Sequence, residues 1–216
     1  MVVPSAYQIY SRRQQGLAET SRLILEFAGV EYVNVFVQDW EQEKETTPLQ
    51  QLPVLRVLKA DGQWKQISES HTMERFLSHT LGLMGEEPLE AAFTDMYHAA
   101  WTDMMSMFMW KVWRAPNDES KRQGASEFWV EFPKFLKKHD SILEKTDGPF
   151  YLGSRPHLPD IYSFTWLNRF ITKWLPSPPE LITEENYPHL WALWKGVREL
   201  DGIKSYIESG RWELPQ

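Results

Sequence analysis

A proline at the head of an apolar run restricts most strongly what this chain can fold into. The segment "PLQQLPVLRVL", residues 48–58, ends in a run that predicts a buried strand, and Pro53 stands where that strand would begin. Proline has no backbone N–H for a sheet ladder, so it is confined to edge strands, first strand residues and bulges. The sequence therefore predicts that sheet pairing stops at Pro53, either as an ordinary strand start or for a purpose that neighbouring residues must reveal.

The pattern of the chain changes near residue 80. Before that point it predicts a strand at "AYQIYS", a helix over 17–29, a strand over 30–37, a hairpin turning at Asp61-Gly62, and a helix in "SESHTMERFLSHTLG". A long loop, 38–52, separates the first three elements from the last three. The order is β-α-β followed by β-β-α, so we expect an α/β domain over 1–82.

From about Glu86 onward only helical signals remain, which predicts an all-α domain over 86–216. The helix over 87–113 has an apolar arc of roughly 200°, about twice what a surface helix needs, so it is expected to bury two faces. Asp103 falls inside this arc, where an ionised carboxylate is costly unless it is paired. Further helices are predicted over 120–145, 160–174, 187–199 and 203–209, with a loop at 175–180.

Composition excludes several classes of function. The chain has no cysteine, which rules out disulfides, zinc thiolate sites and a catalytic cysteine of its own. Any thiol chemistry would need a thiol from a cofactor. The net charge of −7 argues against nucleic acid, and the six histidines show no metal-binding spacing. No apolar stretch predicts a membrane span and no signal peptide is expected, so a cytoplasmic location is expected.

This order of elements, with a proline heading the third strand and helices following, resembles the glutathione transferase superfamily over nearly the whole chain. The resemblance implies a thioredoxin-like N-terminal domain that binds glutathione and an all-helical C-terminal domain that carries the pocket for a hydrophobic substrate. It also implies a cis peptide bond before Pro53. The backbone of Leu52 would then pair with bound glutathione as an added strand does.

Within the superfamily the chain resembles most the sigma class, the prostaglandin-synthase-like branch. "DWEQEK" carries Trp40 and Lys44 four residues apart, followed by "TPLQQLPVL" at the sigma spacing. The resemblance implies that Trp40, Lys44 and Gln51 contact the glycyl end of glutathione, with Lys44 pairing its carboxylate. The alternative for Trp40 and Lys44 is a loop anchor and a solvated lysine.

Two further motifs of the resemblance concern charged ends of glutathione. In "SESHTMERFL", Glu69 and Ser70 would hold the γ-glutamyl group, with Ser70 at a helix N-terminus, a natural site for a carboxylate. "TDMMSMFMW" resembles the sigma helix that sends an aspartate across a homodimer to the partner's glutathione, which maps to Asp103. The alternative for Asp103 is a position at the rim of the apolar arc.

The chain departs from the sigma pattern at the thiol. Aligned through "GLAE", Ser11 takes the place of the sigma catalytic tyrosine, and Tyr10 lies one residue earlier. Neighbours on a strand point to opposite faces, so only one of the two is expected to face the thiol. We favour Ser11, and Tyr10 is then a core residue. Leu17 replaces an arginine frequent in sigma enzymes, which puts a prostaglandin-type activity in doubt.

The aromatic and methionine side chains of the long helix can form either core or pocket. The resemblance implies that the second substrate binds along this helix, and we assign Trp101, Met105 and Trp110 to that pocket. The overall hypothesis is a cytoplasmic homodimeric glutathione transferase acting on a hydrophobic electrophile. The alternatives are a glutathione-dependent cis-trans isomerase of a conjugated alkene in a biosynthetic pathway and a non-catalytic scaffold.

Overall fold

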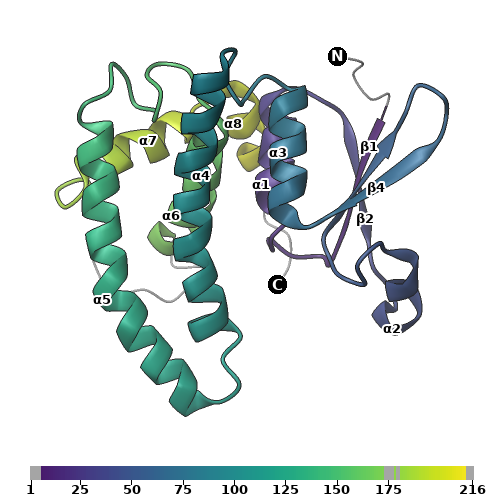
Figure 1. Ribbon diagram of the computed structural model, residues 1–216, viewed down its shortest axis with the longest axis horizontal. Coiled ribbons are helices and arrows are strands. Elements are labelled where there is room, and N and C mark those ends of the chain that lie inside the picture. The colour runs from purple at the N-terminus through teal and green to yellow at the C-terminus, as the bar shows by residue number, and fades with distance from the viewer. Residues whose placement is uncertain (1–5, 173–177, 179–180, 213–216) are drawn as a thin grey trace. The chain divides into compact units, whose positions relative to one another are not determined.

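Four strands organise the first half of the chain into a mixed sheet (Figure 1). They are β1 (Ala6–Ser11), β2 (Tyr32–Phe36), β3 (Val54–Leu58) and β4 (Trp64–Ser68), in the spatial order β2-β1-β3-β4. β1 is parallel to β2 and antiparallel to β3, which is antiparallel to β4. The computed structural model describes residues 6–172, 178 and 181–212. Along the chain a helix follows β1 and another follows β4, which confirms the predicted β-α-β and β-β-α order.

Two helices pack beside this sheet. α1 (Glu19–Phe27) connects the parallel strands β1 and β2, α3 (Ser70–Thr80) follows β4, and the two helices lie side by side (Figure 1). Ile9 of β1 and Leu55 of β3 are directly paired and both fully buried, since residues opposite each other on neighbouring strands point to the same face of the sheet. The long loop between β2 and β3 contains the short helices α2 (Trp40–Glu43) and η1 (Lys44–Thr46).

The second half forms a separate helical unit. Its helices are α4 (Pro88–Phe108), the π-helical turn η2 (Met109–Trp113), α5 (Asp118–Leu143), α6 (Leu158–Ile171) and α7 (Pro188–Arg198). α4 packs against both α5 and α6, yet Leu89, Phe93 and Met96 of its apolar arc stay exposed in the single chain. None of the described helices is both long and apolar enough to cross a bilayer. The predicted loop at 175–180 lies, apart from residue 178, outside the described residues.

The chain divides between Met84 and Gly85, and its end does not stay with the helical unit. The described residues from Arg198 to Trp212 belong to the first unit, where α8 (Asp201–Glu208) packs on α1. Gly202 allows this close approach, since a β-carbon there would overlap the backbone carbonyl of Glu26. The predicted helical domain over 86–216 thus includes one helix that the structure places with the sheet.

Candidate functional site

One edge of the sheet gathers most of the residues assigned to glutathione. Along this edge Ser11 of β1 pairs with Phe36 of β2, Tyr10 pairs with Val54 of β3, and Val54 pairs with Ser68 of β4. β1, β2 and β4 end here, and β3 begins here. The loops that carry Trp40, Lys44, Gln51, Leu52, Pro53, Glu69 and Ser70 therefore all leave from the same edge.

The segment that leads into β3 has the backbone conformation that the resemblance implies. The peptide bond between Leu52 and Pro53 is cis, and β3 begins only at Val54. Pro53 is buried, Leu52 is half-buried and Gln51 is exposed. Leu52 thus lies at the surface just ahead of β3. This is the position that its backbone would need in order to pair with an added peptide strand.

The turn from β4 into α3 contains the most unusual backbone of this edge. Glu69 has φ 68° and ψ 113°, a region that residues with a β-carbon rarely adopt and that is concentrated at functional sites. Its exposed side chain precedes Ser70, which opens α3 and is only 8% exposed. The first N–H groups of a helix lack intrahelical acceptors, and the first turn of this fully described helix carries no acidic side chain. The turn can therefore receive a carboxylate.

The loop with Trp40 and Lys44 is fixed by a residue that the sequence did not single out. The carboxylate of Glu43 accepts the N–H groups of Gln38 at 2.9 Å and Asp39 at 2.7 Å, and also the hydroxyl of Tyr10. Lys44 lies at the end of α2, where its ammonium pairs with Glu41 at 2.6 Å. That hydrogen bond raises the pKa of Lys44.

Tyr10 and Ser11 point to opposite faces of the sheet, as strand alternation predicts. The Tyr10 hydroxyl donates to Glu43, and the guanidinium of Arg56 lies 4.4 Å from the centre of its ring. Burial, together with Glu43, raises the pKa of Tyr10 to about 12. Its hydroxyl therefore connects β1 to the loop of α2. The signal for this contact was missed because Tyr10 and Glu43 are far apart in the sequence.

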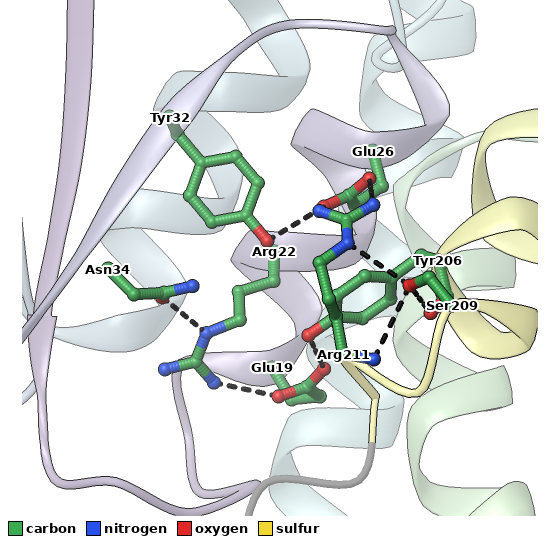
Figure 2. Close-up of polar contacts among 8 residues, drawn as sticks. All are labelled: Glu19, Arg22, Glu26, Tyr32, Asn34, Tyr206, Ser209 and Arg211. Atoms are coloured by element: carbon green, nitrogen blue, oxygen red, sulfur yellow. Dashed lines mark hydrogen bonds and ion pairs between the residues drawn. The ribbon is translucent and has the colours of Figure 1, made fainter.

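Ser11 faces α1 and is part of a buried polar network. Its hydroxyl oxygen accepts a hydrogen bond from Nη2 of Arg22 at 2.8 Å and donates to the carbonyl of Arg12 at 3.0 Å. Arg22 also donates to Glu19 at 2.7 Å and Asn34 at 2.8 Å (Figure 2). The spacing of Glu19 and Arg22 is that of a helical ion pair, but only the structure shows that both are fully buried.

The residues assigned to the second substrate and the dimer lie in the helical unit. Trp101 is fully buried and its indole N–H donates to the hydroxyl of Tyr151 at 2.7 Å, while Met105 is 1% exposed. Trp110, in η2, is 66% exposed, and Asp103 is also exposed. Trp101 and Met105 thus belong to the core of this unit, whereas Trp110 and Asp103 offer accessible surface. Their functional assignments stay predictions.

Comparison with known proteins identifies the family. A profile described as the C-terminal domain of glutathione S-transferase matches residues 102–210, about half of the chain. Glutathione S-transferase S1 of Drosophila melanogaster is 29% identical over 215 residues, covering 95% of this chain and 79% of the fly protein. Glutathione S-transferase 1 of Ascaris suum is 30% identical over 200 residues, covering 89% and 91% of the two chains. The chain belongs to the glutathione S-transferase family.

The fold and a solved structure agree with this assignment. Prostaglandin synthase D of Nilaparvata lugens superposes with a TM-score of 0.79 at 26% identity, covering 94% of this chain and 97% of that one. The predicted fold, a thioredoxin-like unit followed by a helical domain, is confirmed. The named relatives are enzymes, and this chain is an enzyme of the same family. The likeness to prostaglandin D synthases is consistent with the sigma-like branch.

Proposed function

We propose that this enzyme binds glutathione at the sheet edge described above and activates its thiol for attack on a hydrophobic electrophile, as a cytoplasmic homodimer. The observation that supports the proposal most is the convergence of three connections on this one edge, those that follow β1 and β4 and the long loop between β2 and β3. Each loop brings a group complementary to one part of glutathione. Structural residues alone would not need this distribution of charge.

The residues fit the chemistry of glutathione, which has two carboxylates, one ammonium group and a peptide backbone. The N-terminus of α3 with Ser70 would hold the γ-glutamyl carboxylate, and the exposed carboxylate of Glu69 would pair with the ammonium. Lys44 would pair with the glycyl carboxylate after leaving Glu41. These assignments place a group of opposite charge beside each charged group of glutathione.

The remaining contacts are apolar or neutral. Trp40 and Gln51 would line the glycyl end, and the backbone of Leu52 ahead of Pro53 would pair with the cysteinyl residue. The Oγ of Ser68 is buried at this edge and has no hydrogen-bond partner among the described residues, so a further polar group could be accommodated there.

Bound glutathione supplies the thiol that becomes the nucleophile, and Ser11 is the residue we assign to its activation. A hydroxyl that donates to sulfur favours the thiolate. Tyr10, the other candidate, already donates to Glu43. The only proton of Ser11 goes to the adjacent carbonyl of Arg12, a local contact that rotation of the hydroxyl releases.

The second substrate and the dimer partner would use the helical unit. Trp110 would offer apolar surface to the electrophile, with Trp101 and Met105 supporting it from the core. The exposed Asp103 would reach the glutathione of the partner subunit. A glutathione-dependent cis-trans isomerase is the alternative, favoured by the aromatic side chains of the long helix and by Ser11 in the place of the sigma tyrosine. Recovery of a rearranged product without a glutathione adduct would identify it, and an adduct would identify a transferase.

The test is calorimetric titration with glutathione. Ser70→Ala removes a hydroxyl from the carboxylate site and is expected to weaken binding about tenfold, which is about 1.4 kcal/mol. Ser78→Ala is the matched control, because Ser78 is buried near the other end of the same helix. The proposal fails if the wild-type protein does not bind glutathione, or if Ser70→Ala and Ser78→Ala bind it as tightly as the wild type does.

A further inference from the structure

A buried ion pair is connected directly to the hydroxyl assigned to the thiol. Arg22 is fully buried, and its guanidinium donates in three directions, to Ser11, Glu19 and Asn34, at 2.7 to 2.8 Å. Asn34 lies on β2 and Glu19 on the same turn of α1 as Arg22. A planar guanidinium bound on three sides has one orientation, so the position of the Ser11 oxygen relative to this cation is fixed.

The ion pair also has a direction. The guanidinium faces Ser11, whereas Glu19 accepts on its other oxygen from the hydroxyl of Tyr206 in α8, at 3.1 Å. Figure 2 shows this succession from Asn34 and Arg22 through Glu19 to Tyr206. The positive end of the pair is therefore directed toward Ser11, and the negative end toward the C-terminal helix.

We propose that Arg22 is a positioning residue for thiol activation, and that Tyr206 of the C-terminal helix sets the strength of its action through Glu19. This inference rests on the proposed role of Ser11. A cationic donor on the hydroxyl oxygen polarises the O–H bond, which makes Ser11 a stronger donor toward an anion. Donation from Tyr206 draws the carboxylate charge of Glu19 away from Arg22, which leaves more of the cation's field for Ser11.

A second cluster holds Tyr206 in place. Arg211 makes two bonds with Glu26 of α1, at 2.6 and 3.0 Å, and its guanidinium lies 5.0 Å from the centre of the Tyr206 ring. Tyr32 donates to the same Glu26 at 2.9 Å (Figure 2). The charged and titratable groups around the pair are thus Tyr206, which contacts Glu19, and Glu26 of α1 with its two partners, Tyr32 of β2 and Arg211 after α8. None of these last three donates to Glu19 or accepts from Arg22 among the described contacts.

The experiment measures the ultraviolet thiolate band of glutathione bound to the full-length protein as a function of pH. Arg22→Lys keeps the charge but replaces the three nitrogens that bond Asn34, Glu19 and Ser11 with a single ammonium nitrogen, so the pKa of the bound thiol is expected to rise by about one unit, a tenfold loss of thiolate. Tyr206→Phe is expected to raise it by about half as much, in the same direction. Because Arg22→Lys could impair folding, Tyr206→Phe provides the second, milder variant.

Two controls separate positioning from a structural role. Tyr32→Phe removes the same hydroxyl from the neighbouring carboxylate Glu26 and is expected to leave the pKa of the bound thiol unchanged. In a Ser11→Ala background, Tyr206→Phe should have no further effect, since its action passes through Ser11. The inference is overturned if Tyr206→Phe matches the wild type, or if its effect persists without Ser11. If wild-type protein binds glutathione with an unaltered thiol, or does not bind it, the proposed function fails and the inference with it.

Discussion

Each unit of this protein buries a hydrogen-bonded chain of polar side chains. The one in the sheet unit contains ions and is here named the charged chain, and the one in the helical unit contains none and is named the neutral chain. In the sheet unit, Arg22 and Glu19 form an ion pair with no exposed surface. In the helical unit, the Tyr151 hydroxyl accepts from Trp101 and makes a hydrogen bond of 2.6 Å with Nδ1 of His139, to which it donates when the ring carries its proton on Nε2, and every member is neutral. Burial lowers the pKa of His139 to about 4, which keeps its ring uncharged.

This difference in charge indicates different roles for the two hydrogen-bonded chains. Burying a charge pair is expensive in desolvation, and an apolar replacement of similar volume is frequently as stable. A neutral chain of hydrogen bonds has no such penalty and suffices to join helices. The ion pair occurs next to Ser11, the hydroxyl that we propose to activate the thiol, and the neutral hydrogen bonds join α4, α5 and the segment before α6.

The largest expected effect comes from breaking the charged chain on one side. Arg22→Met leaves Glu19 buried without its cation and is expected to lower the free energy of unfolding by about 3 to 5 kcal/mol. Urea denaturation followed by circular dichroism measures this. Glu19→Gln combined with Arg22→Met removes both charges while keeping an acceptor for Tyr206, so the double variant should recover much of the loss. Equal stability of the single and double variants would contradict the view that an unpaired charge causes the damage.

Local patterns predicted much of this molecule from the sequence. The strands, the hairpin turn at Asp61-Gly62 and the long helix follow from periodicity and turn residues, which act over a few positions. The loops with Trp40 and Ser70 were located by motif spacing, and the sheet register then brings them to one edge. Their arrangement could be predicted because the topology of the family determines which strand ends meet.

The contacts that position the site could not be predicted. The return of α8 to α1, the hydroxyl of Tyr206 on Glu19 and the hydroxyl of Tyr10 on Glu43 join residues distant in sequence. A sequence shows that Glu19 and Arg22 are spaced as an ion pair but not that both are withdrawn from water. Burial depends on which elements pack together, and no local pattern contains that information.

A second effect concerns pH and the neutral chain. The pKa of His139 is about 4 in the folded protein and 6.5 in a free side chain, so below pH 6.5 the unfolded state binds the proton first. Stability should be complete above that pH and decrease as pH falls toward 4, by about 3 kcal/mol from this residue. His139→Asn keeps an acceptor for Tyr151 and removes the titration. Between pH 7 and pH 4.5 the variant should lose less stability than the wild type, and equal losses would contradict the assignment.

The smallest effect compares one hydroxyl from each unit. Tyr151→Phe leaves the N–H of Trp101 and Nδ1 of His139 without partners in a fully buried place, and is expected to cost about 2 kcal/mol of unfolding free energy. Tyr32→Phe removes a half-buried hydroxyl from Glu26, which Arg211 still holds with two bonds, and should cost about 0.5 kcal/mol. Urea denaturation of the two variants measures both. Because a neutral chain depends on each of its members while Glu26 has a second donor, Tyr151→Phe should be the more damaging. If Tyr32→Phe were the more damaging variant, the neutral chain would be able to replace a lost hydrogen-bond partner, with water for example. Neutral groups would then tolerate the loss of a partner better than charged groups do.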